Sequence, residues 1–305
     1  MKYFSAFFLS ALLAACAANP TASDEPTVVA SIYPLGYAAE QVLGADASVA
    51  VVTPAGAEPH EFEPSPGQIA AALEADLFVY NGGGIDAWGD DIAAERTRDG
   101  KQSIQALGLY GKLLPADSHR SEFVSSDEAI AFDPHIWLDP DRLSTAGALI
   151  ASKMSDIDPE HENEYLDRFE QFSSEMTALG QSYAEGLRDC ELHDIIVSHG
   201  AYRYLAARFG FNVLMLGGLS PEDEGSLSNI VAIEQLAKQR GIRDVFAESE
   251  VGVADLEGIA RDLGGTVRIL NPIESATPEQ LAGGEDYRVM MESNLASLRA
   301  ALQCR

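Results

Sequence analysis

The order of the expected elements is the feature that most restricts the fold of this chain. Short apolar runs with strand character alternate with amphipathic helical segments in two series, and one long helical segment, residues 159–188, separates the series. Strand followed by helix followed by strand is typical of parallel βαβ units. The sequence therefore predicts an α/β fold with two parallel-sheet lobes joined by one long rigid helix, although no sequence repeat relates the lobes.

The individual elements are expected at the following places. Strands are expected at 27–33, 48–53, 77–80 and 103–107, and then at 194–198, 212–216, 244–247 and 266–270. Helices are expected near 36–43, 66–73, 87–95 and 141–156, and then near 201–209, 228–239, 253–263 and 286–302.

The long segment has a helical period and a suitable start. Pro159 is acceptable in a first helical turn, with Asp158 before it as the cap. Thirty helical residues would extend about 45 Å, which is longer than a small lobe is wide. Two shorter helices broken near Gly180 are the alternative. One face of the segment would carry its apolar side chains, Leu166, Phe169, Met176, Leu179, Tyr183 and Leu187.

The N-terminus reads as an export signal. Lys2 precedes an apolar run that ends at Ala15, too short for a transmembrane span, and no later run approaches 18 apolar residues. The sequence Leu-Ala-Ala-Cys around Cys16 is similar to a bacterial lipobox, in which the cysteine becomes the acylated first residue. An ordinary cleavage site with an incidental cysteine is the alternative.

These observations divide the chain into five parts. We expect a lipoprotein signal peptide at 1–15, a flexible tether at 16–26, an N-terminal lobe at 27–157, a linking helix at 158–189 and a C-terminal lobe at 190–305. The mature chain retains Cys190 and Cys304, and an even pair in an exported protein suggests one disulfide. Two separate buried thiols remain an alternative, because sequence does not give the distance between them.

Charge and composition exclude some classes of function. Apolar residues make up 46% of the chain, enough for real cores, so the chain is not intrinsically disordered. Lys and Arg number 20 against 48 Asp and Glu, which gives a formal net charge of -28. A surface this acidic repels phosphate backbones and anionic lipid. Nucleic acid is therefore not an expected partner, and docking on anionic lipid through a basic patch is not expected either. A solubility or salt adaptation explains the charge more simply than a direct function.

Four residues stand out as candidate metal ligands. His60, His199 and Glu274 each follow an expected strand, and His135 lies in the sequence DPHIWLDP. Ligands bind at the carboxyl ends of parallel strands, and each lobe contributes two of the four residues. Three imidazoles and a carboxylate suit Zn²⁺, whereas Mg²⁺ or Ca²⁺ would require mostly oxygen ligands. We therefore expect a metal site in the cleft between the lobes.

Spacing alone does not establish this site. The four residues are separated by 75, 64 and 75 positions, which matches no short-range ligand motif. A histidine taken singly is more often a core or surface residue than a metal ligand. The other histidines, His119, His161 and His193, lie in polar or helical contexts without comparable surroundings.

A series of ordered sequence blocks adds to this interpretation. From about Val28 to the C-terminus the chain resembles the cluster A-I metal-binding proteins, the zinc and manganese solute-binding subunits of bacterial ABC importers. The blocks that carry the resemblance are SIYPLGYAAEQVLG, EPHEFEPSP, ADLFVYNGGGIDAW, DPHIWLDP, VSHGAYRYLAARFGF, GLSPEDEGS and LNPIES.

The resemblance implies a fold, a ligand set and a function. It implies two lobes joined by one long helix, with metal ligands at His60, His135 and His199; a histidine at the third place favours zinc over manganese. Glu274, in the LNPIE block, is the implied fourth ligand, and Glu58 and Glu248 are lesser candidates. The long His- and Asp-rich loop of many zinc members is absent, because residues 115–132 are short and hold only His119 among histidines.

The implied function is zinc delivery outside the cytoplasm. The protein would be a monomeric, non-enzymatic periplasmic or cell-surface solute-binding protein, anchored at Cys16, that passes Zn²⁺ to an ABC permease driven by a cytoplasmic ATPase. A manganese-binding member of the same family is one alternative. An adhesin would also be compatible with surface anchoring, but no repeat or aromatic array supports it.

Two enzyme classes are further alternatives. A zinc hydrolase would need an open coordination position and a general base, and HEFEP lacks the second histidine of HExxH. A dinucleotide enzyme is suggested by Gly82, Gly84 and Ala87, a loose GxGxxA pattern, but it follows the third strand rather than the first.

Residues beside the candidate ligands have two interpretations each. Asp133 or Asp139 could orient the His135 ring, and Asp139 before Pro140 is more simply a helix cap. The aromatic neighbours could either shield the metal from water or pack in the core; they are Phe62, Trp137 and Tyr202.

Overall fold

The computed structural model describes residues 25–110, 113–115, 132–221 and 225–305. The expected signal peptide, the Cys16 anchor, most of the tether and His119 lie outside the described residues. Within the described part of the chain, no helix is both long and apolar enough to cross a membrane.

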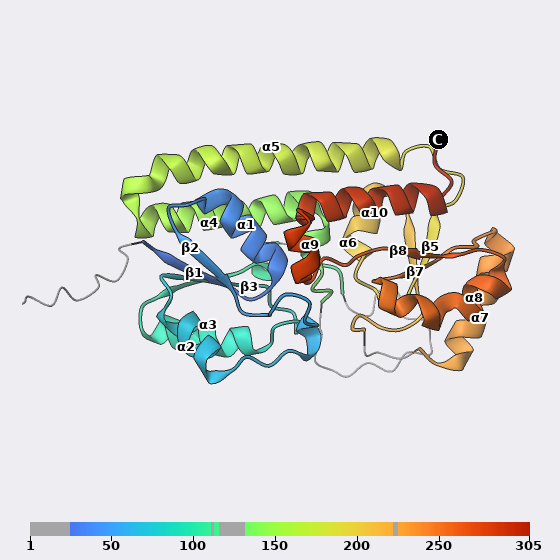
Figure 1. Cartoon of the computed structure of the whole chain (residues 1–305), viewed down its shortest axis with the longest axis horizontal. Coiled ribbons are helices and arrows are strands. Elements are labelled where there is room, and N and C mark those ends of the chain that lie inside the picture. Colours follow the sequence, from blue (N-terminus) through green and yellow to red (C-terminus); the bar gives the residue numbers. More distant parts are fainter. Residues whose placement is uncertain (1–24, 111–112, 116–131, 222–224) are drawn as a thin grey trace, which may run out of the picture.

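Two four-stranded parallel sheets form the centres of the two lobes (Figure 1). The first sheet has the order β2-β1-β3-β4 and the second the order β6-β5-β7-β8. In both sheets the chain starts at an inner strand, adds one neighbour on one side and then continues on the other side. The carboxyl ends of the strands at such a switch point form a crevice where ligands bind. The strands are β1 (Thr27–Ala30), β2 (Ser48–Val51), β3 (Leu77–Tyr80), β4 (Gln102–Gln105), β5 (Asp194–Val197), β6 (Asn212–Met215), β7 (Val245–Ala247) and β8 (Val267–Ile269).

Helices cover the sheets, as the alternating pattern predicts. The first lobe has α1 (Tyr33–Leu43), α2 (Pro66–Glu74) and α3 (Trp88–Arg98). The second lobe has α6 (Arg203–Phe209), α7 (Leu227–Arg240), α8 (Val253–Leu263), α9 (Pro278–Ala282) and α10 (Tyr287–Ala301). Most boundaries match the expected ones within two residues. The first strand is an exception, because it ends at Ala30 and Pro34 lies in the first turn of α1, a position that proline favours.

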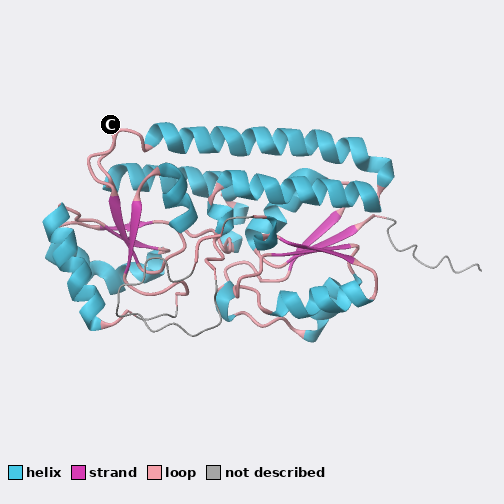
Figure 2. Ribbon diagram, turned by 180° about the vertical axis from the view of Figure 1, so that it is seen from behind, coloured by secondary structure: helices cyan, strands magenta, loops and turns pink. Residues whose placement is uncertain are grey.

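A layer of long helices connects the lobes along one side of the molecule (Figures 1 and 2). Helix α4 (Pro140–Ile157) runs over the first lobe, and α5 (Glu162–Gly186) then passes over both lobes. The expected continuous helix over 159–188 is shorter, because Pro159–His161 form a separate 3₁₀ turn before α5. Helix α5 is unbroken at Gly180, so the alternative of two helices is wrong.

The buried face of α5 differs from the expected one in its first turns. Leu166 is 41% exposed, whereas Tyr165 and Phe172 are buried. Phe169 is only partly buried, and Met176, Leu179 and Tyr183 are buried as expected. Tyr165 occupies the core because its ring packs inside while its hydroxyl donates to the Asp158 carboxylate at 2.7 Å. Asp158 precedes the 3₁₀ turn as expected, and its carboxylate accepts hydrogen bonds from Tyr165 and His161.

The largest core is continuous across both lobes. One cluster of buried apolar side chains includes Val28 of the first sheet, Met176 of α5, Ile195 of the second sheet and Met291 of α10. Separate smaller cores lie around Phe78 in the first lobe and in the second lobe among α7, α8 and the strands. Because the main core has no gap at the lobe boundary, separating the lobes would expose apolar surface to water.

Cys190 and Cys304 form a disulfide across 114 residues of sequence. It joins the segment after α5 to the end of α10, and Leu192 N–H donates to Leu302 O at 3.0 Å beside it. The disulfide therefore fixes the C-terminal helix against the end of the linking helix.

Replacing both cysteines with serine is expected to lower the free energy of unfolding by about 2–4 kcal/mol, because a long loop in the unfolded chain is no longer closed. Thermal denaturation of the double variant against the oxidised parent measures this. Reduction of the parent with dithiothreitol should give the same shift in melting temperature, and an unchanged melting temperature in both experiments would contradict the disulfide.

Candidate metal centre

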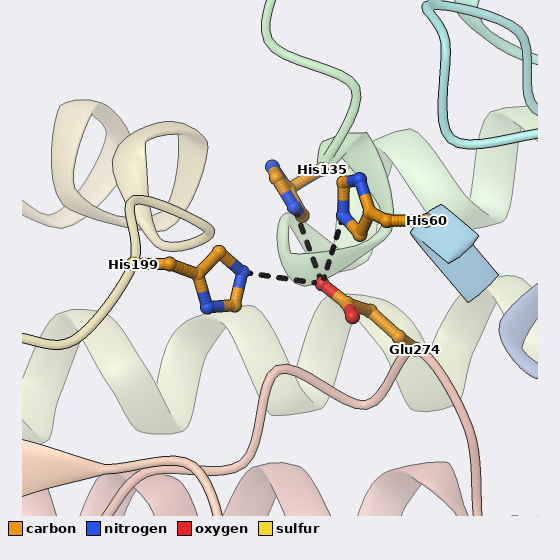
Figure 3. Close-up of side chains that lie close together, drawn as sticks. All are labelled: His60, His135, His199 and Glu274. Carbon is orange, nitrogen blue, oxygen red and sulfur yellow. Dashed lines mark ion pairs between the residues drawn. The ribbon is translucent and has the colours of Figure 1, made fainter. Parts of the chain in front are cut away.

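The four candidate ligands come from four separate segments and converge between the lobes (Figure 3). His60 lies in a 3₁₀ turn, Pro59–Glu61, that follows β2, and His135 directly precedes a second turn, Ile136–Leu138. His199 lies two residues after β5, and Glu274 five residues after β8. The expectation that strand ends of both lobes meet at one point is thus met by the geometry.

The donor atoms lie close enough together to share one ion. Oε1 of Glu274 lies 3.2 Å from Nε2 of His135, 3.4 Å from Nε2 of His199 and 3.8 Å from Nε2 of His60. All four donor atoms lie within 4.8 Å of one another. Ligands bound to zinc at ~2.0–2.1 Å in a tetrahedron are about 3.3 Å apart, so the three distances from Glu274 Oε1 lie within about half an ångström of that spacing.

The same atoms are buried and unsatisfied by protein hydrogen bonds. The Nε2 atoms of all three histidines and both carboxylate oxygens of Glu274 are shielded from solvent and make no hydrogen bond of good geometry. Buried polar atoms without partners are costly, and several of them facing one point require a common partner. A divalent cation that accepts three imidazole nitrogens and one carboxylate oxygen fits this requirement.

Carboxylates behind the rings set which nitrogen faces the site. Asp133 Oδ1 lies 2.8 Å from Nδ1 of His135, and Glu248 Oε1 lies 2.6 Å from Nδ1 of His199. Each carboxylate accepts the Nδ1 proton, which leaves Nε2 directed at the centre. Asp133 is thus the residue that orients His135. Glu248, a lesser candidate for the fourth ligand, instead positions His199 and is itself held by the Ser198 hydroxyl at 2.8 Å.

The other proposed neighbours have different contacts. Asp139 caps α4 by accepting from Asp141 N–H at 3.1 Å, and it also pairs with Arg208, so it does not orient His135. Glu58 accepts from the His60 backbone N–H at 3.1 Å and therefore shapes the turn that carries this ligand.

The second lobe also holds the segment that carries His135. Arg203 Nη1 lies 3.6 Å from Asp133 Oδ2, and the Tyr204 hydroxyl donates to the Asp133 carbonyl at 3.0 Å. Both residues belong to α6, which begins shortly after His199. A candidate ligand of the first lobe is therefore fixed by side chains of the second, which sequence spacing could not show.

The glycine-rich turn after β3 has a structural role at this site. Gly82, Gly83 and Gly84 all have positive φ, and a Cβ on Gly83 would approach Pro134 Cβ to 3.3 Å. The Asn81 amide donates to the Pro134 carbonyl at 2.9 Å, one residue before His135. The turn thus packs against the His135 segment, which explains the glycines without a dinucleotide.

Aromatic side chains surround the ligands. Trp137 is fully buried, and its Nε1–H donates to the Pro272 carbonyl at 2.8 Å in the turn that carries Glu274. Tyr202 is buried as well, and its hydroxyl donates to the Leu270 carbonyl. Both rings therefore contribute to the core and fix the segment before Glu274, while Phe62 is only partly buried and packs with the smaller core of the first lobe.

The proton equilibria of the metal-free site reflect this mixture of charges. Burial lowers the pKa of His199, but the hydrogen bond to Glu248 and the nearby carboxylate of Glu274 outweigh burial and raise the pKa to about 10. Burial also lowers the pKa of His135, but Asp133 and Glu274 outweigh burial and raise this pKa above its usual value. Burial raises the pKa of Glu274, but the three histidines that face its carboxylate lower this pKa well below its usual range. A metal ion must therefore displace protons from imidazoles at neutral pH.

Comparison with known proteins identifies the family. The family described as zinc-uptake complex component A, periplasmic, matches residues 28–301. The chain belongs to this family. Its two-lobed fold with a long linking helix is shared with the crystal structure of the Zn(II)-bound ZnuA-like domain of Streptococcus pneumoniae AdcA, at a TM-score of 0.76 and 30% identity, with 91% of this chain and 99% of that chain covered.

Two curated relatives cover nearly the whole chain. The zinc-binding lipoprotein AdcA of Streptococcus pneumoniae is 29% identical over 94% of this chain and 58% of its own length. The high-affinity zinc uptake system protein ZnuA of Bacillus subtilis is 26% identical over 99% of this chain and 98% of its own length. This member of the ZnuA family thus spans little more than half of AdcA but almost all of the Bacillus protein.

The pKa of His199 predicts how zinc affinity depends on pH. Because the metal-free imidazole stays protonated up to about pH 10, zinc competes with a proton throughout the neutral range. The apparent affinity should therefore keep rising from pH 6 to 8.5, by about tenfold per unit for each displaced proton. Competition with a chromophoric chelator measures it. A plateau above pH 6.5, the ordinary value for histidine, would contradict a raised pKa.

Replacing Asp133 with asparagine should weaken zinc binding about 10–100-fold, because the acceptor that orients His135 loses its charge. Asp139→Asn is the matched control, since Asp139 lies close in sequence, caps α4 and makes no contact with the ring. That control should lower the melting temperature and leave the zinc dissociation constant within about twofold. Equal losses of affinity in both variants would show that Asp133 has no special role.

Proposed function

We propose that this protein captures Zn²⁺ outside the cytoplasm and delivers it to an ABC-type importer. His60, His135, His199 and Glu274 would bind the ion, and the carrying observation is the convergence of their buried, unsatisfied donor atoms between two lobes. The relatives named for zinc binding and zinc uptake support this assignment. The expected partners are the permease and its cytoplasmic ATPase.

The donor set favours carriage over catalysis. Four protein ligands complete a tetrahedral sphere and leave no position for a substrate or an activated water. The two carboxylates behind the rings are engaged, Glu248 by His199 and Ser198 and Asp133 by His135, and neither is available as a general base. A zinc hydrolase remains a weaker alternative, and a chelator-sensitive hydrolysis of peptides or esters would support it.

The donor set also favours zinc over manganese. Three imidazoles and a single carboxylate form a nitrogen-rich site, whereas Mn²⁺ is better served by carboxylate and water oxygens. The rings are also held from behind by Asp133 and Glu248, which limits rearrangement toward a larger coordination number.

The proposed division of the chain follows from this function. Residues 27–157 and 190–305 would act as the two metal-binding lobes, with 158–189 linking them. Residues 1–15 would direct export and be removed, and Cys16 would anchor a monomer to the membrane through 16–26. Labelling of the exported protein with a radioactive fatty acid, with and without Cys16→Ser, tests the anchor.

Alanine in place of His60 or His199 should remove most zinc binding. Elemental analysis after dialysis should find about one zinc per parent chain and little in either variant. Zinc should raise the melting temperature of the parent by mass action but not that of the variants. The control is His193→Ala, because His193 is exposed and lies away from the site. Zinc retained by both site variants, or manganese preferred by the parent, would refute the proposal.

A further inference from the structure

The turn that carries Glu274 contains a backbone conformation that needs support. Ile273, directly before Glu274, has a φ of 56°, in the left-handed region that β-branched residues avoid. Such a conformation is strained and persists only where the surrounding structure enforces it. The Ile273 side chain is fully buried, so the turn is fixed both by packing and by the hydrogen bonds around it.

One buried side chain supplies the main hydrogen bonds to this turn. Asn294 of α10 is 2% exposed, and its Oδ1 accepts from the Asn271 N–H at 2.8 Å while its Nδ2 donates to the Asn271 carbonyl at 2.7 Å. Asn271 in turn restrains Ile273, because the Asn271 Oδ1 accepts a hydrogen bond from the Ile273 N–H at 2.7 Å. The chain of bonds ends one residue before the carboxylate.

Helix α10 is a rigid support for this clamp. The Tyr183 hydroxyl of α5 donates to the Met291 carbonyl at 2.6 Å, and the Tyr287 hydroxyl donates to the Trp137 carbonyl at 2.5 Å. The disulfide at Cys304 follows directly after the helix. Asn294 is thus held in place by the linking helix and by the segment that contains His135.

An asparagine at a buried helical position lowers the stability of the fold. Its helix propensity is low, and its amide loses hydration on burial, so a leucine would suit the surrounding core better unless both amide bonds are needed. Here both are used, and both go to the backbone of the Glu274 turn.

We propose that Asn294 is a positioning residue for the metal centre. It holds the Asn271–Glu274 turn with Ile273 in the left-handed conformation, and it thereby directs the Glu274 carboxylate toward the three imidazoles. The inference rests on the proposed function, because it takes Glu274 as a zinc ligand. Asn294 does not contact the ion and acts only through the turn.

A double-mutant cycle separates positioning from general stability. Asn294→Leu, and the nearly isosteric Asn294→Asp as a second variant, should weaken zinc binding tenfold or more. Glu274→Gln should also weaken it, and adding Asn294→Leu or Asn294→Asp to Glu274→Gln should cause little further loss. Chelator competition gives the dissociation constants, and circular dichroism of the metal-free variants confirms folding.

Asn229→Leu is the matched control. Asn229 is 1% exposed and also bonds backbone, donating to the carbonyls of Met215 and Leu216, but that turn carries no candidate ligand. It should lower the melting temperature without changing the zinc affinity. The absorption spectrum of bound Co²⁺ should change in Asn294→Leu as in Glu274→Gln, and stay unchanged in Asn229→Leu.

The outcomes distinguish this inference from the function on which it rests. If Glu274→Gln weakens binding but the Asn294 variants do not, or if their losses add fully, Asn294 is only structural and the inference fails alone. If His60→Ala abolishes binding while Glu274→Gln has no effect, zinc capture stands and the inference falls with the fourth ligand. If the parent binds no zinc, both fail.

Discussion

The structure depends on the burial of one carboxylate among three imidazole nitrogens. Glu274 is 3% exposed, and an uncompensated carboxylate at such depth would cost several kcal/mol. Among the described residues, the three Nε2 atoms face its Oε1 from 3.2–3.8 Å away. Their histidines lie between 75 and 214 positions from Glu274 in the sequence. The lobes, the turns and the helices behind them must all place these groups together, because no single element can compensate the charge.

The continuous core explains how such distant segments stay in register. Helices α4 and α5 pack on α1 and the first sheet, and the same cluster of buried side chains extends to β5 and α10. Opening the cleft widely would break this cluster and also the bonds from Trp137 and Tyr204 across the lobe boundary. The physical consequence is a site that is largely formed before the ion arrives, so binding energy is not consumed in assembling it.

The elements could be predicted from the sequence because they depend on local signals, whereas the set of four candidate ligands rested on the family resemblance as well. Short apolar runs that alternate with helical segments specify strands such as β3. His199 and Glu274 stand out because each follows a strand. The buried face of α5 was harder to predict. Leu166 has the right period, but Tyr165 occupies the core because the Asp158 carboxylate is available for its hydroxyl. The roles of Glu248, Arg203 and Asn294 depend on partners far away in sequence, and no local pattern encodes such pairings.

Charge balance connects the surroundings of the site to the kind of ion it suits. Asp133, Glu248 and Glu274 bring three carboxylates to the centre, and Arg203 beside Asp133 supplies one positive charge. The excess of two negative charges is neutralised by a divalent cation, or in its absence by protons on the imidazoles. A monovalent ion would leave a buried charge unpaired, which is costly in a poorly hydrated site. The carboxylates therefore favour a divalent charge, while the imidazoles favour an ion that prefers nitrogen ligands.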